Sequence, residues 1–201
     1  MAAESLRGEF QLLPEPIGIT APGKVYSELE EDTISELIDD ARWIFSGMIY
    51  GYVVTWVPPF NARRIKEKLD VKLVAQIPAG DEKLKTLSAN KLDGVIYVLM
   101  EYTSDSAQQK RLEAWRSSLF PSAAGEGNSP IAGGSRRKGL EMAIKEAIKN
   151  HLVKREFNRP KRVQARVVLT EFPQIGLSKG AYRVLVSIRM DINSVQNYEI
   201  D

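Results

Sequence analysis

Residues 182–192 carry the feature that most constrains the fold, because an apolar side chain stands at every second position. These side chains are Tyr182, Val184, Val186, Ile188, Met190 and Ile192. Since successive side chains of a β-strand point to opposite faces, the spacing predicts a long strand with one buried face. The run at 163–170 is also rich in β-branched residues, and we expect the two segments to pair as a hairpin. The chain must therefore build a sheet.

Two long amphipathic helices are predicted beside this sheet. Both segments repeat apolar residues at the three- and four-residue spacing of one helix face. The first stripe consists of Ile34, Leu37, Ile38, Ala41, Ile44, Phe45 and Met48. The second consists of Leu140, Ile144, Ala147, Ile148 and Leu152, and Ser135 is placed to cap that helix.

Other segments complete the predicted fold. Further strands are expected at 49–57, 71–77 and 95–103, and the last is apolar enough to lie centrally in a sheet. A short basic helix is expected after Asn61, with an apolar face of Ala62, Ile65 and Leu69. A helix at 105–119 is expected to bury Leu112, Trp115 and Leu119. The result is an α+β fold: a mainly antiparallel sheet of about five strands with the two long helices on one face. Each half of the chain has the order helix, strand, strand. This repeated order is the pattern expected from a degenerate duplication.

The domain organisation follows from the distribution of proline and glycine. Residues 1–24 contain three prolines and one strand-like piece, 17–20, and are expected to form an extended, loosely attached arm. A single α+β domain is expected over 25–201. Residues 121–134 contain four glycines and two prolines. This composition predicts a mobile loop that separates the domain into two halves.

Composition excludes several kinds of chemistry. The 201 residues include no cysteine and one histidine, His151, so disulfides, cysteine nucleophiles and thiolate-bound metals are excluded. We predict no metal site, no cofactor and no catalytic residue, and a structural role for His151 near a helix end. The 28 basic and 26 acidic side chains give a net charge of +2, and 43% of the residues are hydrophobic. These values are typical of a soluble globular protein.

The location of the protein is predicted from its ends and its apolar runs. The longest apolar run, 43–60, is interrupted by polar residues and glycine and is shorter than the roughly 20 residues of a membrane-spanning helix. No transmembrane segment is therefore predicted. The first residues lack the basic and apolar regions of a signal peptide. The absence of cysteine and the character of these first residues slightly favour a mature periplasmic or exported protein over a cytoplasmic one.

Residues 176–180 spell Gly-Leu-Ser-Lys-Gly, the letters of a catalytic nucleophile elbow. That elbow requires a strand before the serine and a helix after it, whereas a strand follows here. We therefore expect a hairpin loop with Gly180 at its end.

Arg136, Arg137 and Lys138 are the candidate anion contacts. They follow two glycines at the start of the second helix, where a flexible turn, free N–H groups and cations together suit an anion. They also open the segment 136–166, which contains eleven lysines and arginines against three glutamates. A basic stripe of this kind suits nucleic acid or an anionic membrane surface.

Tyr50, Tyr52 and Trp56 are the candidate interface aromatics. They share one face of the strand predicted at 49–57. Tyrosine and tryptophan bury a large area and tolerate a wet edge, so both core packing and a partner interface fit.

These observations favour a non-catalytic interaction or structural module of the cell envelope or periplasm, whose partner is another protein or a second copy of the chain. Two alternatives stay open. One is a binder of anionic ligands or polymers through 136–166, with peripheral membrane contact; nucleic acid is the less favoured ligand. The other is an enzyme that uses neither histidine nor cysteine.

Overall fold

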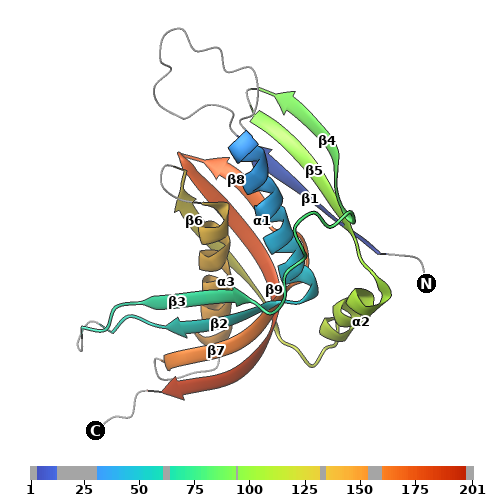
Figure 1. Ribbon diagram of the computed structural model, residues 1–201. Helices are drawn as coiled ribbons and strands as arrows, with labels where there is room; N and C mark the ends of the chain where they lie inside the picture. The colour runs from blue at the N-terminus through green and yellow to red at the C-terminus, as the bar shows by residue number, and fades with distance from the viewer. Residues whose placement is uncertain are drawn as a thin grey trace.

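A computed structural model describes residues 4–12, 31–60, 64–93, 95–131, 135–153 and 160–197. Within these ranges the chain forms three helices and nine strands in two antiparallel sheets (Figure 1). In chain order they are β1 (Ser5–Leu12), α1 (Glu31–Ile49), β2 (Tyr52–Val57), β3 (Lys68–Leu73), β4 (Leu84–Leu92), β5 (Val95–Thr103), α2 (Ser106–Trp115), β6 (Ser122–Pro130), α3 (Arg136–Val153), β7 (Pro160–Leu169), β8 (Gln174–Ser178) and β9 (Ala181–Asn197). The α+β class with antiparallel pairing is confirmed. The expected single sheet of about five strands is wrong.

The larger sheet has the strand order β3-β2-β7-β9-β6, and β8 also pairs with β9. The predicted pairing of 163–170 with 182–192 is confirmed, although β8 is an unpredicted strand between them. Residues 181–185 of β9 pair with both β6 and β8, so these two strands lie on opposite edges of β9. Residues 188 and 189 of β9 pair with both β6 and β7, so β7 also lies opposite β6. β7 and β8 therefore share one edge of β9. The 17-residue β9 is therefore the spine of this sheet.

The smaller sheet has the order β1-β5-β4, so β5 is central, as its apolar sequence predicts. Its first strand corrects the expectation of a loosely attached arm at 1–24. Residues 5–12 pair with β5 along their whole length and bury Leu6, Phe10 and Leu12. The strand-like piece at 17–20 lies outside the described residues.

The two long helices form as predicted and cover the core. All five apolar residues predicted for the stripe of α3 are buried. The Lys138 N–H donates to Ser135 Oγ at 3.1 Å, which confirms the predicted cap. In α1 the stripe is narrower than expected, because Ile34 and Ile38 are 41% and 39% exposed. The five remaining members of that stripe are buried.

Residues 122–130 form β6, so the prediction of a mobile loop at 121–134 is wrong for them; 132–134 lie outside the described residues. The glycines that suggested a loop allow a helix to approach instead. A Cβ on Gly125 would lie 2.2 Å from the Ala143 carbonyl oxygen, and one on Gly127 would lie 2.1 Å from that of Gly139. The backbone of α3 therefore rests directly on the backbone of β6.

Three shorter predictions also need correction. Residues 64–69 are not helical, because Arg64 has a positive φ of 54°, Ile65 forms a bridge with Phe60, and β3 begins at Lys68; 61–63 lie outside the described residues. The strand expected at 71–77 ends at Leu73. The helix expected at 105–119 ends at Trp115. It buries Leu112 but leaves Leu119 84% exposed.

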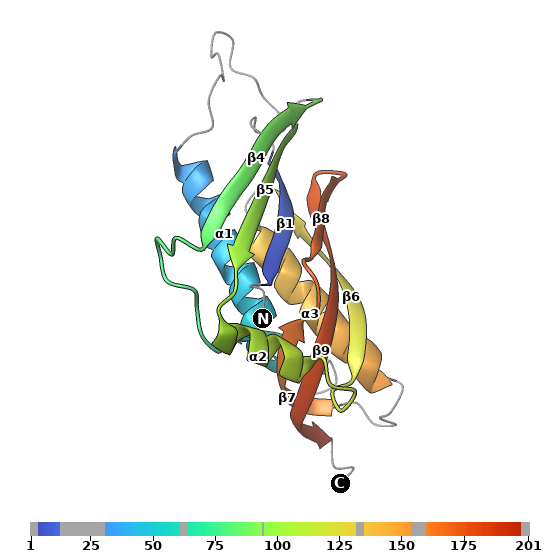
Figure 2. The same ribbon diagram turned by 90° about the vertical axis from the view of Figure 1, so that its right-hand side faces the viewer.

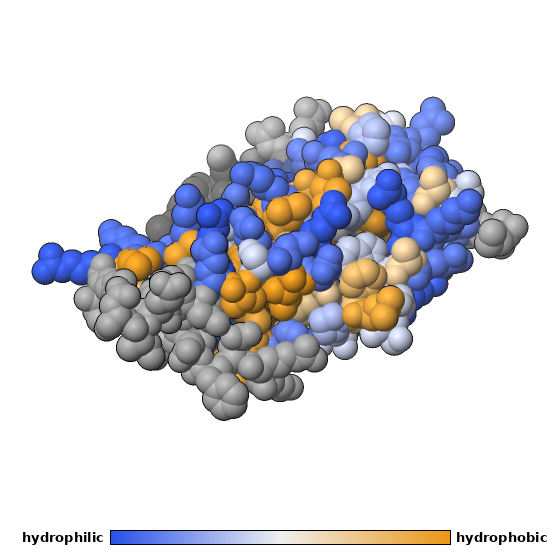
Figure 3. Space-filling model, turned by 90° about the horizontal axis from the view of Figure 1, so that it is seen from below, coloured by the Kyte–Doolittle hydropathy of each residue, from blue (hydrophilic) through white to orange (hydrophobic). Residues whose placement is uncertain are grey.

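Viewed from below, hydrophobic and hydrophilic residues are interspersed (Figure 3). Large exposed hydrophobic side chains are scattered over many elements, as on most proteins. They are Ile34, Ile38, Val53, Val74, Leu87, Leu92, Leu119 and Val153.

Candidate interaction site

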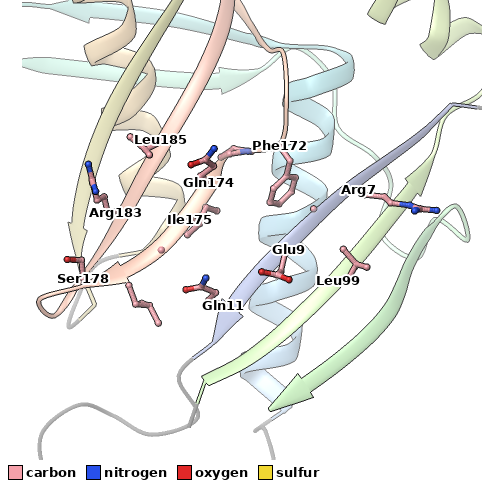
Figure 4. Close-up of a pocket in the computed structure, with 14 residues that line it drawn as sticks. Arg7, Glu9, Gln11, Leu99, Phe172, Gln174, Ile175, Ser178, Arg183 and Leu185 are labelled. Atoms are coloured by element: carbon pink, nitrogen blue, oxygen red, sulfur yellow. The ribbon is translucent and has the colours of Figure 1, made fainter. Parts of the chain in front are cut away.

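A hollow lies where the two sheets meet. The edge strand β1 of the smaller sheet runs beside β8 of the larger one (Figures 1 and 2). A groove of about 590 Å3 separates them on the outer face of the protein. Figure 4 shows side chains from both strands around it. Within the described ranges, no further strand pairs with β1 or β8 along this groove.

Among the residues that the structure describes, backbone groups of β1 at the groove have no hydrogen-bonding partner. The Ser104 N–H donates to the Glu4 carbonyl at 3.0 Å, whereas the neighbouring Thr103 N–H points the other way. Backbone groups of successive strand residues point to opposite edges, so the even-numbered residues of β1 bond to β5. The N–H and C=O groups of Arg7, Glu9 and Gln11 therefore point away from β5, into the groove.

The backbone of β8 does the same from the opposite side. Lys179 and Gly180, with φ of 50° and 75°, form the two-residue turn that joins β8 to β9. The hairpin loop predicted at 176–180 is confirmed for these two residues, whereas 176–178 belong to the strand β8. Such a turn makes Ser178 and Ala181 a hydrogen-bonded pair. By alternation, the backbone groups of Ile175 and Leu177 point into the groove.

Phe172 closes the floor of the groove. A Cβ on Gly8 would lie 2.1 Å from Cε2 of Phe172, so the phenylalanine ring occupies the space that a side chain at position 8 would need. The ring centroid lies 5.2 Å from that of Phe10 and 5.6 Å from that of Phe45. The floor is thus an aromatic cluster contributed by β1, α1 and the segment before β8. Half-buried Leu99 and Leu185 add apolar surface on either side.

The rim of the groove is charged and polar. Arg7 lies 3.4 Å from Glu101 on one side. On the other side Arg183 donates two hydrogen bonds of 2.8 Å to Glu126, and this contact lowers the pKa of that carboxyl group. Both arginine side chains are more than half exposed. An apolar floor with a polar rim is the arrangement found in protein interfaces.

The predicted anion contacts lie elsewhere, at the start of α3, and they do not form a free cationic cluster. Arg136 is 7% exposed, and its Nη1 lies 3.1 Å from Asp40 Oδ2. Its guanidinium carbon lies over the ring of Tyr182, 5.1 Å from the ring centroid. Arg137 stacks on Trp43 at 5.2 Å. Lys138 is exposed. Burial raises the pKa of Asp40, although Arg136 opposes the rise. The anion beside Arg136 is therefore a carboxylate of the chain itself.

The candidate interface aromatics also have internal partners. Tyr52 is fully buried and its hydroxyl donates to the Trp43 carbonyl at 3.1 Å. Trp56 is 5% exposed and its indole N–H donates to Glu67 at 3.0 Å. The interface interpretation is wrong for these two residues, which belong to the core. Tyr50 is half-buried and accepts a hydrogen bond from Gln108 at 2.8 Å.

The remaining expectations from the sequence concern His151, metal ligands and membrane-spanning helices. His151 lies in the last turn of α3, as expected. Among the described residues, no group of three or more histidine, aspartate or glutamate side chains is placed to hold a metal ion. No helix in the same ranges is long and apolar enough to cross a membrane.

Sequence reasoning missed the groove. One local signal could have indicated its first wall, since Leu6, Gly8, Phe10 and Leu12 alternate with polar residues. No local signal could have paired that wall with β8, which lies more than 160 residues further along the chain.

Comparison with other proteins places the chain in a family. A protein family of unknown function matches residues 3–198. The chain belongs to this family. A further similarity is to an uncharacterized protein of Treponema pallidum (strain Nichols), which is 19% identical over 194 residues. The match covers 93% of this chain and 78% of that protein. No solved structure matches the chain.

Proposed function

We propose that the protein is a non-catalytic interaction module that holds a segment of a partner polypeptide in the groove between β1 and β8. The single observation that carries the proposal is the pair of strand edges that face each other with backbone groups to which no other described strand is bonded. A polypeptide is the ligand that offers matching donors and acceptors at a regular spacing. The cell envelope or periplasm is the location we propose for this interaction.

The shape and chemistry of the groove support a chain rather than a compact ligand. Its volume of about 590 Å3 falls within the range of small-molecule pockets, but such pockets enclose most of the ligand surface. Here the hollow lies open on the outer face of two adjacent strands (Figure 4). Apolar side chains form its floor, and the arginines Arg7 and Arg183 stand on opposite rims.

Photo-crosslinking in the cells that naturally produce the protein tests this proposal. A benzophenone amino acid at Gln174, which lines the groove, should form adducts with a polypeptide that mass spectrometry can sequence. The same amino acid at Val53, exposed on the interior strand β2, is the matched control. Leu177→Glu should abolish the adducts at 174, whereas Val53→Glu should leave them unchanged. Equal adducts at both positions, or none at 174, would contradict the proposal.

A further inference from the structure

We infer that the partner segment binds as a β-strand inserted between β1 and β8, so that the two sheets become one. This inference rests on the proposed function and specifies how the partner is held. The completed order would be β4-β5-β1, the inserted strand, then β8-β9-β6, with the known neighbours unchanged. Addition of a strand to a free sheet edge is an established mode of peptide recognition. Here one strand meets two edges at once.

The backbone groups on both walls support this mode. Arg7, Glu9 and Gln11 offer donors and acceptors from β1, and Ile175 and Leu177 offer them from β8. Figures 1 and 4 show β1 and β8 running in the same direction. A single inserted strand that is antiparallel to one is therefore antiparallel to the other. It satisfies both edges with the pairing that the rest of the molecule uses.

The surroundings of the groove specify the side chains of the inserted strand. Alternate residues of such a strand point to opposite faces of the sheet. Those on the inner face meet the aromatic floor around Phe172, and those on the outer face meet water between Arg7 and Arg183. The partner segment is thus extended, with apolar residues alternating with polar ones.

Insertion requires the two edges to separate. Some Cα atoms of β1 and β8 lie within 8 Å of each other, whereas two strand spacings span roughly 9.4–9.8 Å. Among the described strands, β8 has backbone hydrogen bonds with β9 alone, along one edge. To keep the β8–β9 ladder, the two strands of this hairpin have to bend away from β1 together.

Because the chain contains no cysteine, one introduced thiol allows a probe to be tethered at a chosen position. Ser178→Cys places the thiol at the exposed end of β8, beside the groove. Val53→Cys places it on β2, whose two edges are already paired with β3 and β7. The probe is a peptide of alternating valine and threonine with a cysteine at one end. Its matched control carries N-methyl groups on every second amide.

We expect the unmodified peptide to stay disulfide-linked to the 178 variant roughly tenfold more than the N-methylated peptide at equal thiol competition, because at least two hydrogen bonds are lost. No such preference is expected at position 53. Hydrogen exchange should slow at the amides of Arg7, Glu9, Gln11, Ile175 and Leu177 when the unmodified peptide is attached. These amides point into the groove.

Three results would overturn the inference, and they separate it from the proposed function. Equal retention of both peptides at 178, above that at 53, means docking without strand insertion, so only the inference fails. Equal retention at 178 and 53 contradicts docking in the groove as well. Sedimentation shows whether the untethered protein dimerises. If it does, and the 178 variant then retains no peptide, the occupant is a second copy of the chain and not a partner segment.

Discussion

Nη1 of Arg136 lies 3.1 Å from Oδ2 of Asp40, and this contact joins the start of α3 to the middle of α1. Their side chains are only 8% and 14% exposed. A buried ion pair that loses one partner leaves a charge without compensation, at a cost of about 3–5 kcal/mol. The local sequence would suggest that three cations at a helix start repel the helix dipole, but Arg136 has a binding partner inside the protein.

We therefore expect Arg136→Met to destabilise the protein by about 3–5 kcal/mol in urea unfolding. The double variant Arg136→Met with Asp40→Leu should recover most of the loss, because it removes both charges. Lys138→Ala, on the exposed neighbour, is the control and should change the free energy of unfolding by less than about 0.5 kcal/mol. If Lys138→Ala is as damaging as Arg136→Met, the effect does not come from the ion pair.

The same pair predicts a pH dependence. Burial raises the pKa of Asp40 above its ordinary value of 3.8; Arg136 and Arg137 oppose the rise, and Glu36 adds to it. The pKa of Asp40 is thus higher in the folded state than in the unfolded state. Its contribution to the free energy of unfolding is therefore lost as the pH rises from the unfolded-state pKa through the folded-state pKa. Without Arg136 the pKa should rise further. The loss caused by Arg136→Met should therefore be larger at about pH 7 than at about pH 4.5, and equal losses at both would contradict this assignment.

The contact of α3 with β6 predicts opposite results for glycines in two strands. Gly125→Ala places a Cβ against the backbone of α3 and should destabilise the protein by about 1–3 kcal/mol or more, because neither backbone can move easily. Gly176→Ala on β8 meets open space and should leave stability unchanged or slightly higher. Thermal and urea unfolding compare the two. If Gly125→Ala leaves the free energy of unfolding unchanged, the backbone of α3 does not lie as close to Gly125 as the structure places it.

A serine in α1 anchors the segment after β3. Ser46 Oγ accepts a hydrogen bond of 2.9 Å from the buried Ile77 N–H and donates one of 2.5 Å to the Arg42 carbonyl. Ser46→Ala leaves the Ile77 donor unsatisfied, so we expect a loss of about 1–3 kcal/mol in urea unfolding. Ser88→Ala, on the edge strand β4, is the control and should have little effect. Faster hydrogen exchange at the Ile77 amide should accompany the loss.

The parts of the fold that the sequence predicts are those where burial follows one period. The stripe of α3 and the alternation in β9 survive in the structure because each element buries one face only. β4 was not predicted, because it is exposed on both faces and carries Lys85, Asn90 and Lys91 in place of an apolar face. Its pairing with β5 depends on hydrogen bonds of the backbone, which leave no trace in composition.

The candidate site was less predictable than the fold. Charge and glycine singled out Arg136 and its neighbours, but charge alone does not reveal an internal partner such as Asp40, which lies in a different helix. The groove depends on the meeting of β1 with β8, and neither strand carries a recognisable motif. Its chemistry lies in backbone groups that every residue has. Only the spatial arrangement makes them a site.

The pairing of β1 with β5 also has a consequence for synthesis on the ribosome. The pairing partner of β1 is made roughly 90 residues after it, so β1 waits roughly 5 to 20 s at translation rates of about 5–20 residues per second. During this interval Leu6, Phe10 and Leu12 have no strand to pair with. The smaller sheet cannot close until residue 103 has emerged, and the nascent chain presents an apolar strand to chaperones until then.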